Sequence, residues 1–470
     1  MLSSHFIRRT LAFGFVVFSA FPAAAQRQDT LRLTIKSAVE QAISGSDEVR
    51  ITQAQVELAD AQVTAARAAG IPQARLTSTY SKVFENARAN AVGSVFNQPN
   101  TYNTSLNLSQ AVFQGGRIMA GRRVAESTRE AVRYDQREVQ ARVSVDAQRA
   151  YLQALYTQQL VALQDTNLTL ASARLAQVEQ LERAGRAARY DVLRARVARS
   201  NIEPLLIQAR NDRDIALLEL KRQLNIPVDQ PVKLATAIDT AALRARLASL
   251  VDTTRVADRA SLRSAELTVR AREDAIRVAR ADYFPTLSVS LQSGYQAFPP
   301  IGMGFPSSFG KTSPDFCNPP SSSGQSCQNG GWFTDRSMQV TGSWALFDGF
   351  RTRSNINVAR AQANIASLQL AQAREQVGLD VGRTRSELRR ALAVYEARQQ
   401  TVAEATEAYQ LAALRFSTGL STQLEVSDAQ LSMLNAQSGA VRSVYDLYLA
   451  AADLARALGQ PVPTPPTVGQ

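Results

Sequence analysis

Two nine-residue stretches, SWALFDGFR at 343–351 and SQAVFQGGR at 109–117, are near copies of each other. Each has a phenylalanine, a glycine two positions later and an arginine two positions after that. The glycine suits a sharp turn, because it adopts positive φ without a steric penalty. Each stretch follows alternating apolar and polar residues and precedes a long segment without proline, a pattern that predicts a strand-to-helix junction. Its glycine and arginine are Gly115 and Arg117 in the first copy and Gly349 and Arg351 in the second.

The similarity continues well beyond these two junctions. Residues 109–227 align with residues 343–461 at a constant offset of 234, without a gap. Upstream, residues 63–80 align with residues 276–293 at an offset of 213, so the second copy carries an insertion of 21 residues in between. We therefore expect an internal tandem duplication. Its structural repeats, each built of helices and strands, span 26–240 and 241–461.

Four segments alternate between apolar and polar residues, which is typical of strands with one apolar and one polar face. They span about 73–84 and 101–113 in the first repeat and about 286–298 and 333–347 in the second. The segment 299–332 is rich in Pro, Ser, Gly and Asn, which predicts a long loop containing the insertion.

The segments 116–183 and 351–417 contain no proline and predict helices that reach about 100 Å at 1.5 Å per residue. A seam of apolar residues with spacings of 3, 4 and 3 predicts coiled-coil packing in the first of them. It consists of Leu168, Ala171, Leu175 and Val178. Each long helix is expected to end at a glycine, Gly185 or Gly419, after which a second helix returns.

The first 25 residues have the three parts of a secretory signal peptide, namely Arg8 and Arg9, an apolar run at 11–21 and the small residues 23–25. The apolar run has 11 residues, fewer than the roughly 20 of a membrane-spanning helix, which favours cleavage over an uncleaved anchor. At the other end, residues 462–470 are expected to be a disordered tail.

Removal of the signal peptide also removes His5, the one histidine of the chain. That argues against histidine-based catalysis and most zinc sites, and we expect neither an enzyme nor a cofactor or metal. The net charge of +12 comes from arginines spread among acidic residues along the chain. A nucleic-acid binder would gather them in one patch, so solvated helix faces are the better interpretation. The stretch GFPSSFGKT at 304–312 has the wrong spacing for a phosphate loop.

Four strands leave unpaired edges and are too few to close a barrel, for which about eight are needed. A homotrimer would supply 12 strands, an even number that suits an outer-membrane barrel with lipid on its apolar face and water in its lumen. A soluble β-sandwich on helical stalks is the alternative, and the secretion signal and the long helices disfavour it.

With its duplication, its two Phe-x-Gly-x-Arg junctions and its two glycine-containing reversals, at 183–196 and 417–430, the chain resembles the TolC family of outer-membrane efflux proteins. The resemblance covers nearly the whole mature chain. It implies a homotrimer whose 12-stranded transmembrane β-barrel in the outer membrane continues into a coiled-coil α-helical barrel in the periplasm. It also implies an exit duct of a tripartite efflux pump or a type I secretion system. The implied partners are a periplasmic adaptor and an inner-membrane pump of the RND or ABC type.

The resemblance places the functional residues at the reversals. It implies adaptor contacts at Gly185 and Gly419, whose other role is the turn itself. It implies a pore gate at Glu425, Asp428 and Asp191, where rings of carboxylates would favour cations, although a solvated helix face would show the same residues. Closing links of the family fall on Tyr190, Phe416 and Ser421, and the last two depart from the family's Tyr and Arg. For the junction arginines Arg117 and Arg351, capping or packing outweighs a binding role.

Cys317 and Cys327 lie in the long loop, which the resemblance places outside the cell, and a disulfide between them suits that oxidising setting. A metal site would need more ligands. Two other function classes stay open beside the exit duct: a trimeric coiled-coil adhesive or structural surface protein, and, with less support, an outer-membrane enzyme.

Overall fold

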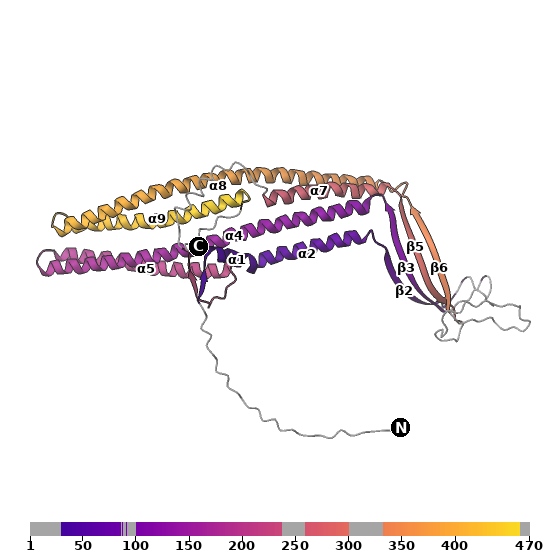
Figure 1. The fold of residues 1–470 in the computed structure, drawn as a ribbon, viewed down its shortest axis with the longest axis horizontal. Helices are drawn as coiled ribbons and strands as arrows, with labels where there is room; N and C mark the ends of the chain where they lie inside the picture. Colours follow the sequence, from indigo (N-terminus) through magenta and orange to yellow (C-terminus); the bar gives the residue numbers. More distant parts are fainter. Residues whose placement is uncertain are drawn as a thin grey trace, which may run out of the picture.

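The computed structural model describes residues 30–85, 87, 91, 100–236, 259–299 and 332–460. The signal peptide, the tail, the boundary at 240, the loop at 300–331 and both cysteines lie outside the described residues. The described chain forms an elongated rod, with helices along most of its length and a sheet at one end (Figure 1).

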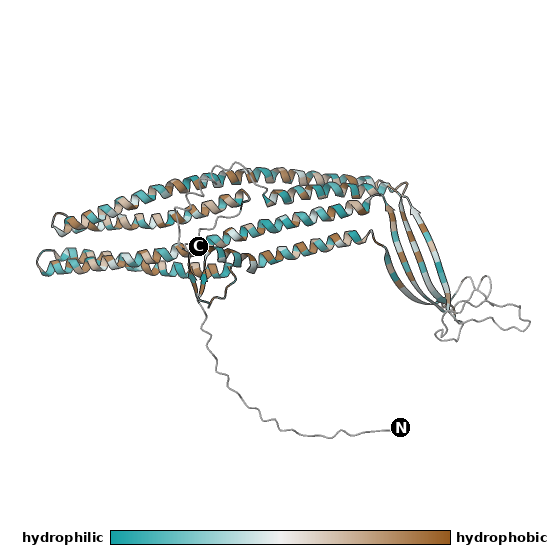
Figure 2. Cartoon of the chain, viewed as in Figure 1, coloured by the Kyte–Doolittle hydropathy of each residue, from teal (hydrophilic) through white to brown (hydrophobic). Residues whose placement is uncertain are grey.

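The sheet consists of four antiparallel strands in the order β2-β3-β5-β6. The strands are β2 (Gln73–Lys82), β3 (Asn100–Gln114), β5 (Thr286–Ala297) and β6 (Trp332–Ser343). The register puts Leu108 opposite Leu291 and Leu291 opposite Met338, while the next row is Asn107, Gln292 and Ser337. The alternation in the sequence thus becomes one mainly apolar face, which also carries Arg336, and one polar face, as the colouring along the strands also indicates (Figure 2).

The expected strand at 333–347 is too long, because β6 ends at Ser343. Its last partner is Thr286, the first residue of β5. The preceding Pro285 has no N–H with which to extend the ladder. Trp344 therefore lies beyond the strand, where its indole N–H donates to the carbonyl oxygen of Tyr283 at 3.1 Å.

Two pairs of very long helices run away from the sheet. The first pair is α4 (Arg117–Arg183) and α5 (Arg189–Gln223), and the second is α8 (Arg351–Ser417) and α9 (Gln423–Ala457). The corresponding helices have the same lengths, 67 and 35 residues, and start 234 positions apart. The sequence offset is therefore repeated element by element in the structure. No helix among the described residues is long and apolar enough to span a membrane.

Shorter helices fill the space beside the long ones. They are α1 (Ile35–Gly45), α2 (Asp47–Ala68), α7 (Ala260–Arg280) and the short 3-10 helix η2 (Ala281–Tyr283). Next to the sheet, α2 lies against α4, α4 against α7, and α7 against α8, which makes one curved layer (Figure 1). Only α2 and α8 lie at the open ends of this layer, just as β2 and β6 are the edge strands of the sheet.

The largest buried cluster lies where the two helix pairs meet, near the middle of the rod. Here β1 (Leu31–Leu33) pairs in parallel with β4 (Val232–Leu234). The fully buried Tyr151 of α4 ties this small sheet to the helices, with its hydroxyl oxygen 2.9 Å from the Leu33 carbonyl and 2.8 Å from Thr236 Oγ1. Burial raises the pKa of the Tyr151 hydroxyl.

Candidate functional site: helical tips and strand-to-helix junctions

Both helical hairpins reverse at the end of the rod farthest from the sheet, and the two turns have the same backbone design (Figure 1). In the first, Gly185 has φ +71° and the Arg186 N–H donates to the carbonyl of Leu181. In the second, Gly419 has φ +78° and the Leu420 N–H donates to the carbonyl of Arg415. This bond from the third residue beyond the helix to its third-last residue is a Schellman motif, which favours glycine at the positive-φ position.

A Cβ at either glycine would meet no heavy atom of the described chain within 4 Å. Space within the chain therefore does not require glycine at Gly185 or Gly419, whereas the backbone conformation does. The absent side chains leave both turns open to a surface that approaches from outside.

Of the expected gate acids, Asp191 helps to begin a helix. Its Oδ2 accepts the N–H of Ala188 at 3.2 Å, which satisfies a backbone donor that has no partner inside α5. Glu425 occupies the same position of α9, where its N–H donates to the hydroxyl of Thr422 at 3.4 Å. Both carboxylates also lie at a helix N-terminus, where the macrodipole favours negative charge.

Glu425 and Asp428 are exposed and stand three residues apart, so they share one face of α9. No ion pair between either carboxylate and a basic side chain occurs within the described part of the chain. Two free carboxylates on one face near the tip provide the charge that a cation-selective constriction needs.

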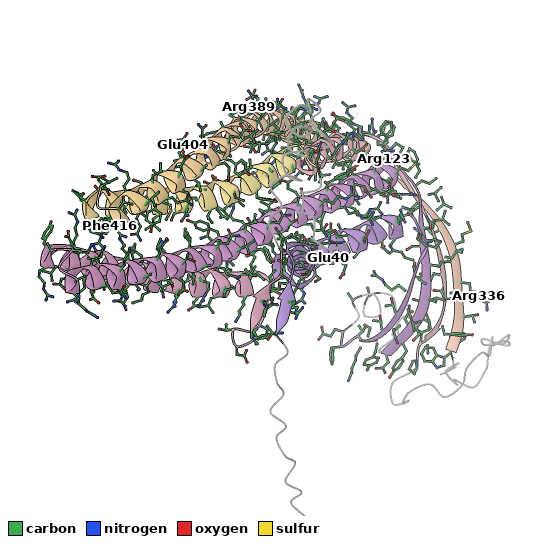
Figure 3. The ribbon with its side chains drawn as sticks, turned by 60° about the vertical axis from the view of Figure 1, so that its left-hand side comes forward. Glu40, Arg123, Arg336, Arg389, Glu404 and Phe416 are labelled. Carbon is green, nitrogen blue, oxygen red and sulfur yellow. The ribbon has the colours of Figure 1, made fainter. Side chains whose placement is uncertain are left out.

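The sequence prediction missed a buried arginine near the tips. Arg174 of α4 is 9% exposed, and its guanidinium carbon lies 4.0 Å from the centre of the Phe416 ring in α8. Its Nε and Nη2 donate to Oε1 of Gln423 in α9 at 3.2 and 3.0 Å, and Nη1 donates to Gln177. Burial lowers the pKa of Arg174. This side chain thus connects both hairpins, and Figure 3 shows Phe416 near the end of the second.

The same contact corrects the seam that the sequence predicts. In the part of α4 beyond Thr157, the buried positions are Asn167, Ala171, Arg174 and Val178, whereas Leu168 and Leu175 are only half-buried. The spacing of 4, 3 and 4 places a charged residue inside the seam. The sequence signal for this buried arginine was its spacing, because Arg174 lies three residues after Ala171 and four before Val178.

The three residues expected to form closing links have different surroundings in the described chain, with no contact recorded between them. Phe416 is half-buried against Val178, Val192 and Ala195. Ser421 is half-buried, with its hydroxyl 3.4 Å from the carbonyl of Ala412. Tyr190 is 66% exposed. Their participation in a gate stays a prediction.

The two strand-to-helix junctions share a backbone but differ in their surroundings. Gly115 and Gly349 have φ of +58° and +66°. A Cβ at Gly115 would lie 2.5 Å from the Ala281 carbonyl oxygen, whereas a Cβ at Gly349 would meet nothing within 4 Å. The first junction is thus packed against the end of the neighbouring α7, and the second faces open space.

The junction arginines differ in the same way. Arg117 forms an ion pair with Asp282 of η2, just after the end of α7. Arg351 is exposed, and no ion pair between it and an acidic side chain is found among residues the structure describes. Asp348 caps the start of α8, because its Oδ2 accepts the N–H of Thr352 at 2.8 Å. Hydrogen bonds donated by Thr352 lower the pKa of Asp348. A packing role is therefore visible for Arg117 but not for Arg351.

Over the described ranges, no group of three or more His, Cys, Asp and Glu side chains is placed to hold a metal ion. The geometry therefore defines a rod-like protein with an open-edged sheet at one end and two glycine turns at the other.

The model of one protein family, described as outer membrane efflux protein, matches residues 38–225 and 255–460. The chain is 27% identical over 378 residues to the pyoverdine export outer membrane protein OpmQ of Pseudomonas putida, covering 76% of this chain and 70% of OpmQ. It is 26% identical over 447 residues to protein CyaE of Bordetella pertussis, covering 93% and 86% of the two chains.

Solved structures share the fold. The outer-membrane channel OprN aligns with a TM-score of 0.70 at 21% identity, covering 92% of this chain and 91% of OprN. CusC aligns with a TM-score of 0.72 at 16% identity, covering 94% and 96%.

The chain belongs to the outer membrane efflux protein family. It is an outer-membrane efflux channel of the kind that serves tripartite pumps or secretion, and its place in this family disfavours an adhesive surface protein.

Proposed function

We propose that three copies of this chain form one continuous duct, with a 12-stranded barrel in the outer membrane and a helical barrel that extends into the periplasm. The observation that carries the proposal is the pair of open ends: β2 and β6 are edge strands, and α2 and α8 end the helical layer beside them. An exposed strand edge with a flanking apolar face calls for a partner strand.

The helices at the open ends support the same arrangement. Along α8, Val358 and Ile365 are each 54% exposed and Leu379 is 68% exposed, at spacings of 7 and 14. Along α2, Ile51 and Leu58 are each 59% exposed, also 7 apart. Apolar residues at heptad spacing form a stripe that packs against another helix, and we assign α2 of the next copy to the stripe on α8.

The unequal junctions fit this ring. Arg117 and Gly115 meet α7 of their own chain, whereas Arg351 and Gly349 face open space. In a trimer, α2 of the next copy would fill that space, because α2 is the counterpart of α7 in the first repeat. Every junction of the ring would then have the same kind of neighbour.

The internal repeat also sets the register between copies. Within the chain, Leu106 of β3 pairs with Ser293 of β5. The repeat counterpart of Leu106, at an offset of +234, is Val340 of β6, and the counterpart of Ser293, at an offset of −213, is Tyr80 of β2. We therefore expect Val340 of one copy to lie opposite Tyr80 of the next. Both residues belong to the apolar face. Directly opposite residues in antiparallel strands have Cα atoms about 4.5–5.5 Å apart, which lies within the range of disulfides.

The test is therefore a pair of cysteines in a Cys317→Ser, Cys327→Ser background. Val340→Cys combined with Tyr80→Cys should give a covalent trimer on oxidation, resolved by denaturing gel electrophoresis. Val340→Cys with Ser78→Cys, two residues out of register on the same face, is the matched control. Equal cross-linking of both pairs, or of neither, contradicts the proposed ring.

For the tips we propose two roles. Glu425 and Asp428 form rings of carboxylates at the narrow end, with Asp191 nearby, and set a preference for cations. The turns at Gly185 and Gly419 receive a periplasmic adaptor, which links the duct to an inner-membrane pump that supplies the energy. A proton-driven pump and an ATP-driven exporter both fit this arrangement.

A further inference from the structure

A groove of about 430 Å³ lies where the end of α7 meets the start of α8, beside the sheet. The residues that line it are Arg280, Tyr283, Phe284, Arg353, Ile356, Asn357 and Arg360. Arg353, Asn357 and Arg360 stand on one face of α8, at spacings of 4 and 3. Three guanidinium groups thus line one small groove.

Like charges repel, so such a cluster is usually neutralised by acidic side chains. Among the ion pairs of the described residues, none involves Arg280, Arg353 or Arg360. The acids nearest in sequence are engaged elsewhere, Asp282 with Arg117 and Asp348 with Thr352. The groove therefore carries an uncompensated positive charge.

At the corresponding positions of the first repeat, an acidic side chain compensates part of the positive charge. The counterpart of Arg280 is Arg67, and the counterpart of Arg360 is Glu126. Glu126 accepts from Arg67 at 2.9 Å and from Arg122 at 2.8 Å, and these bonds lower its pKa to about 2. The counterpart of Arg353 is Met119. The second repeat thus has two arginines where the first has an acid and a thioether.

Apolar side chains form the rest of the groove. Ile356 is 4% exposed, whereas Tyr283 and Phe284 are 53% and 52% exposed just before β5 begins at Thr286. Trp344 hydrogen-bonds to the backbone of Tyr283 and is itself 59% exposed. Exposed aromatic residues of this kind gather at the level of lipid headgroups. Charge and apolar surface thus adjoin each other at the end of the strands.

We propose that this groove binds the phosphate of an anionic phospholipid headgroup, held by Arg280, Arg353 and Arg360, with its glycerol and acyl portion against Tyr283 and Phe284. Arginine suits this ligand because its planar fork donates two parallel hydrogen bonds to a phosphate. The membrane level of the groove rests on the proposed function. The groove lies within one chain, and the exposed stripe at Val358 and Ile365 is on another face of α8.

The test uses the purified full-length protein in detergent, with lipid retention counted by native mass spectrometry. The probes are dioleoylphosphatidylglycerol, which is anionic, and dioleoylphosphatidylcholine, which is zwitterionic. The variant Arg353→Met with Arg360→Glu installs the residues of the first repeat. The matched control, Arg270→Met with Arg272→Glu, makes the same charge change at exposed residues of α7 outside the groove.

We expect the wild-type protein and the control to retain phosphatidylglycerol with at least fivefold preference over phosphatidylcholine, and the groove variant to lose that preference. Equal retention by the groove variant overturns the proposal. Binding of inorganic phosphate by the wild-type protein without retention of either lipid would assign the site to a soluble phosphate instead and also overturns it.

The same spectra report the mass of the assembly. A chain that binds the lipid but does not assemble as a trimer would contradict the proposed duct but support the lipid site. A trimer without selective lipid retention would support the duct but contradict the lipid site.

Discussion

Arg174 and Phe416 are separated by more than half of the chain, yet the guanidinium carbon of Arg174 lies 4.0 Å from the centre of the Phe416 ring. The contact joins the first helical hairpin to the second near the tip. Because Arg174 is 9% exposed and also binds the buried Gln423, neither charge nor ring is freely solvated. A desolvated cation–π contact contributes about 2 kcal/mol.

The first prediction concerns this contact. Phe416→Leu should weaken the connection between the hairpins by about 1–2 kcal/mol, which shifts a closed-to-open equilibrium of the tip by about tenfold. Single-channel recording should show a higher open probability. Phe416→Tyr keeps the ring and should behave like the wild type. Equal currents for all three proteins would show that the contact does not hold the tips together.

Two substitutions at Gly419 distinguish its role in the turn from its role in adaptor contact. Gly419→Val places a β-branched residue at φ +78° and should destabilise the turn by about 1–2 kcal/mol. Gly419→Asn tolerates this backbone conformation but adds a side chain. We expect Gly419→Asn to keep wild-type conductance in a bilayer and to lose export in cells, measured with the adaptor present. Full export by Gly419→Asn would show that Gly419 is needed for the turn and not for adaptor contact.

The buried hydroxyl of Tyr151 should contribute to the stability of the protein. Tyr151→Phe removes the hydroxyl that contacts the Leu33 carbonyl and Thr236 Oγ1 and leaves the Thr236 N–H without its buried acceptor, which should cost about 1–3 kcal/mol. Denaturant titration followed by circular dichroism measures the loss. Tyr190→Phe, at a 66% exposed site, is the control and should change nothing. A Tyr151→Phe protein as stable as the control would refute the role of the network.

Glu126 gives a prediction with a definite pH sign. Hydrogen bonds from Arg67 and Arg122 lower its folded pKa to about 2 from an ordinary value of 4.5. A depressed folded pKa stabilises the protein above the unfolded value, and this stabilisation is lost as pH falls from about 4.5 towards 2. Because the carboxylate is 30% exposed, we expect about 1 kcal/mol or less.

The measurement compares the wild type with Glu126→Gln by denaturation at pH 7 and pH 2.5. The difference in stability should be present at pH 7 and shrink at the lower pH. Glu57→Gln, at an exposed position of α2, serves as the control. A difference that grows on acidification would contradict the assigned cause.

Strands, long helices and junctions could be predicted because their signals are local. Alternation places Leu108, Leu291 and Met338 on one face, and the repeated glycines coincide with positive φ at Gly115, Gly185, Gly349 and Gly419. These features depend on neighbours within a few residues. The helix ends lie within a few residues of the expected ones for the same reason.

Features that depend on distant residues could not be predicted in the same way. The burial of Arg174 depends on Gln423, 249 positions away, and an arginine in a charged helix looks like a solvated one. The different surroundings of Gly115 and Gly349 depend on α7, although their local sequences are nearly the same. The end of β6 depends on Pro285, across the sheet.

The central claim is that this chain forms a duct whose narrow end carries Glu425 and Asp428. The most direct test is single-channel recording of the purified mature protein in a planar bilayer with a salt gradient. We predict small, cation-selective currents that grow and lose selectivity in the Glu425→Ala, Asp428→Ala variant. A folded trimer whose currents have the same size and selectivity with and without these carboxylates would contradict it.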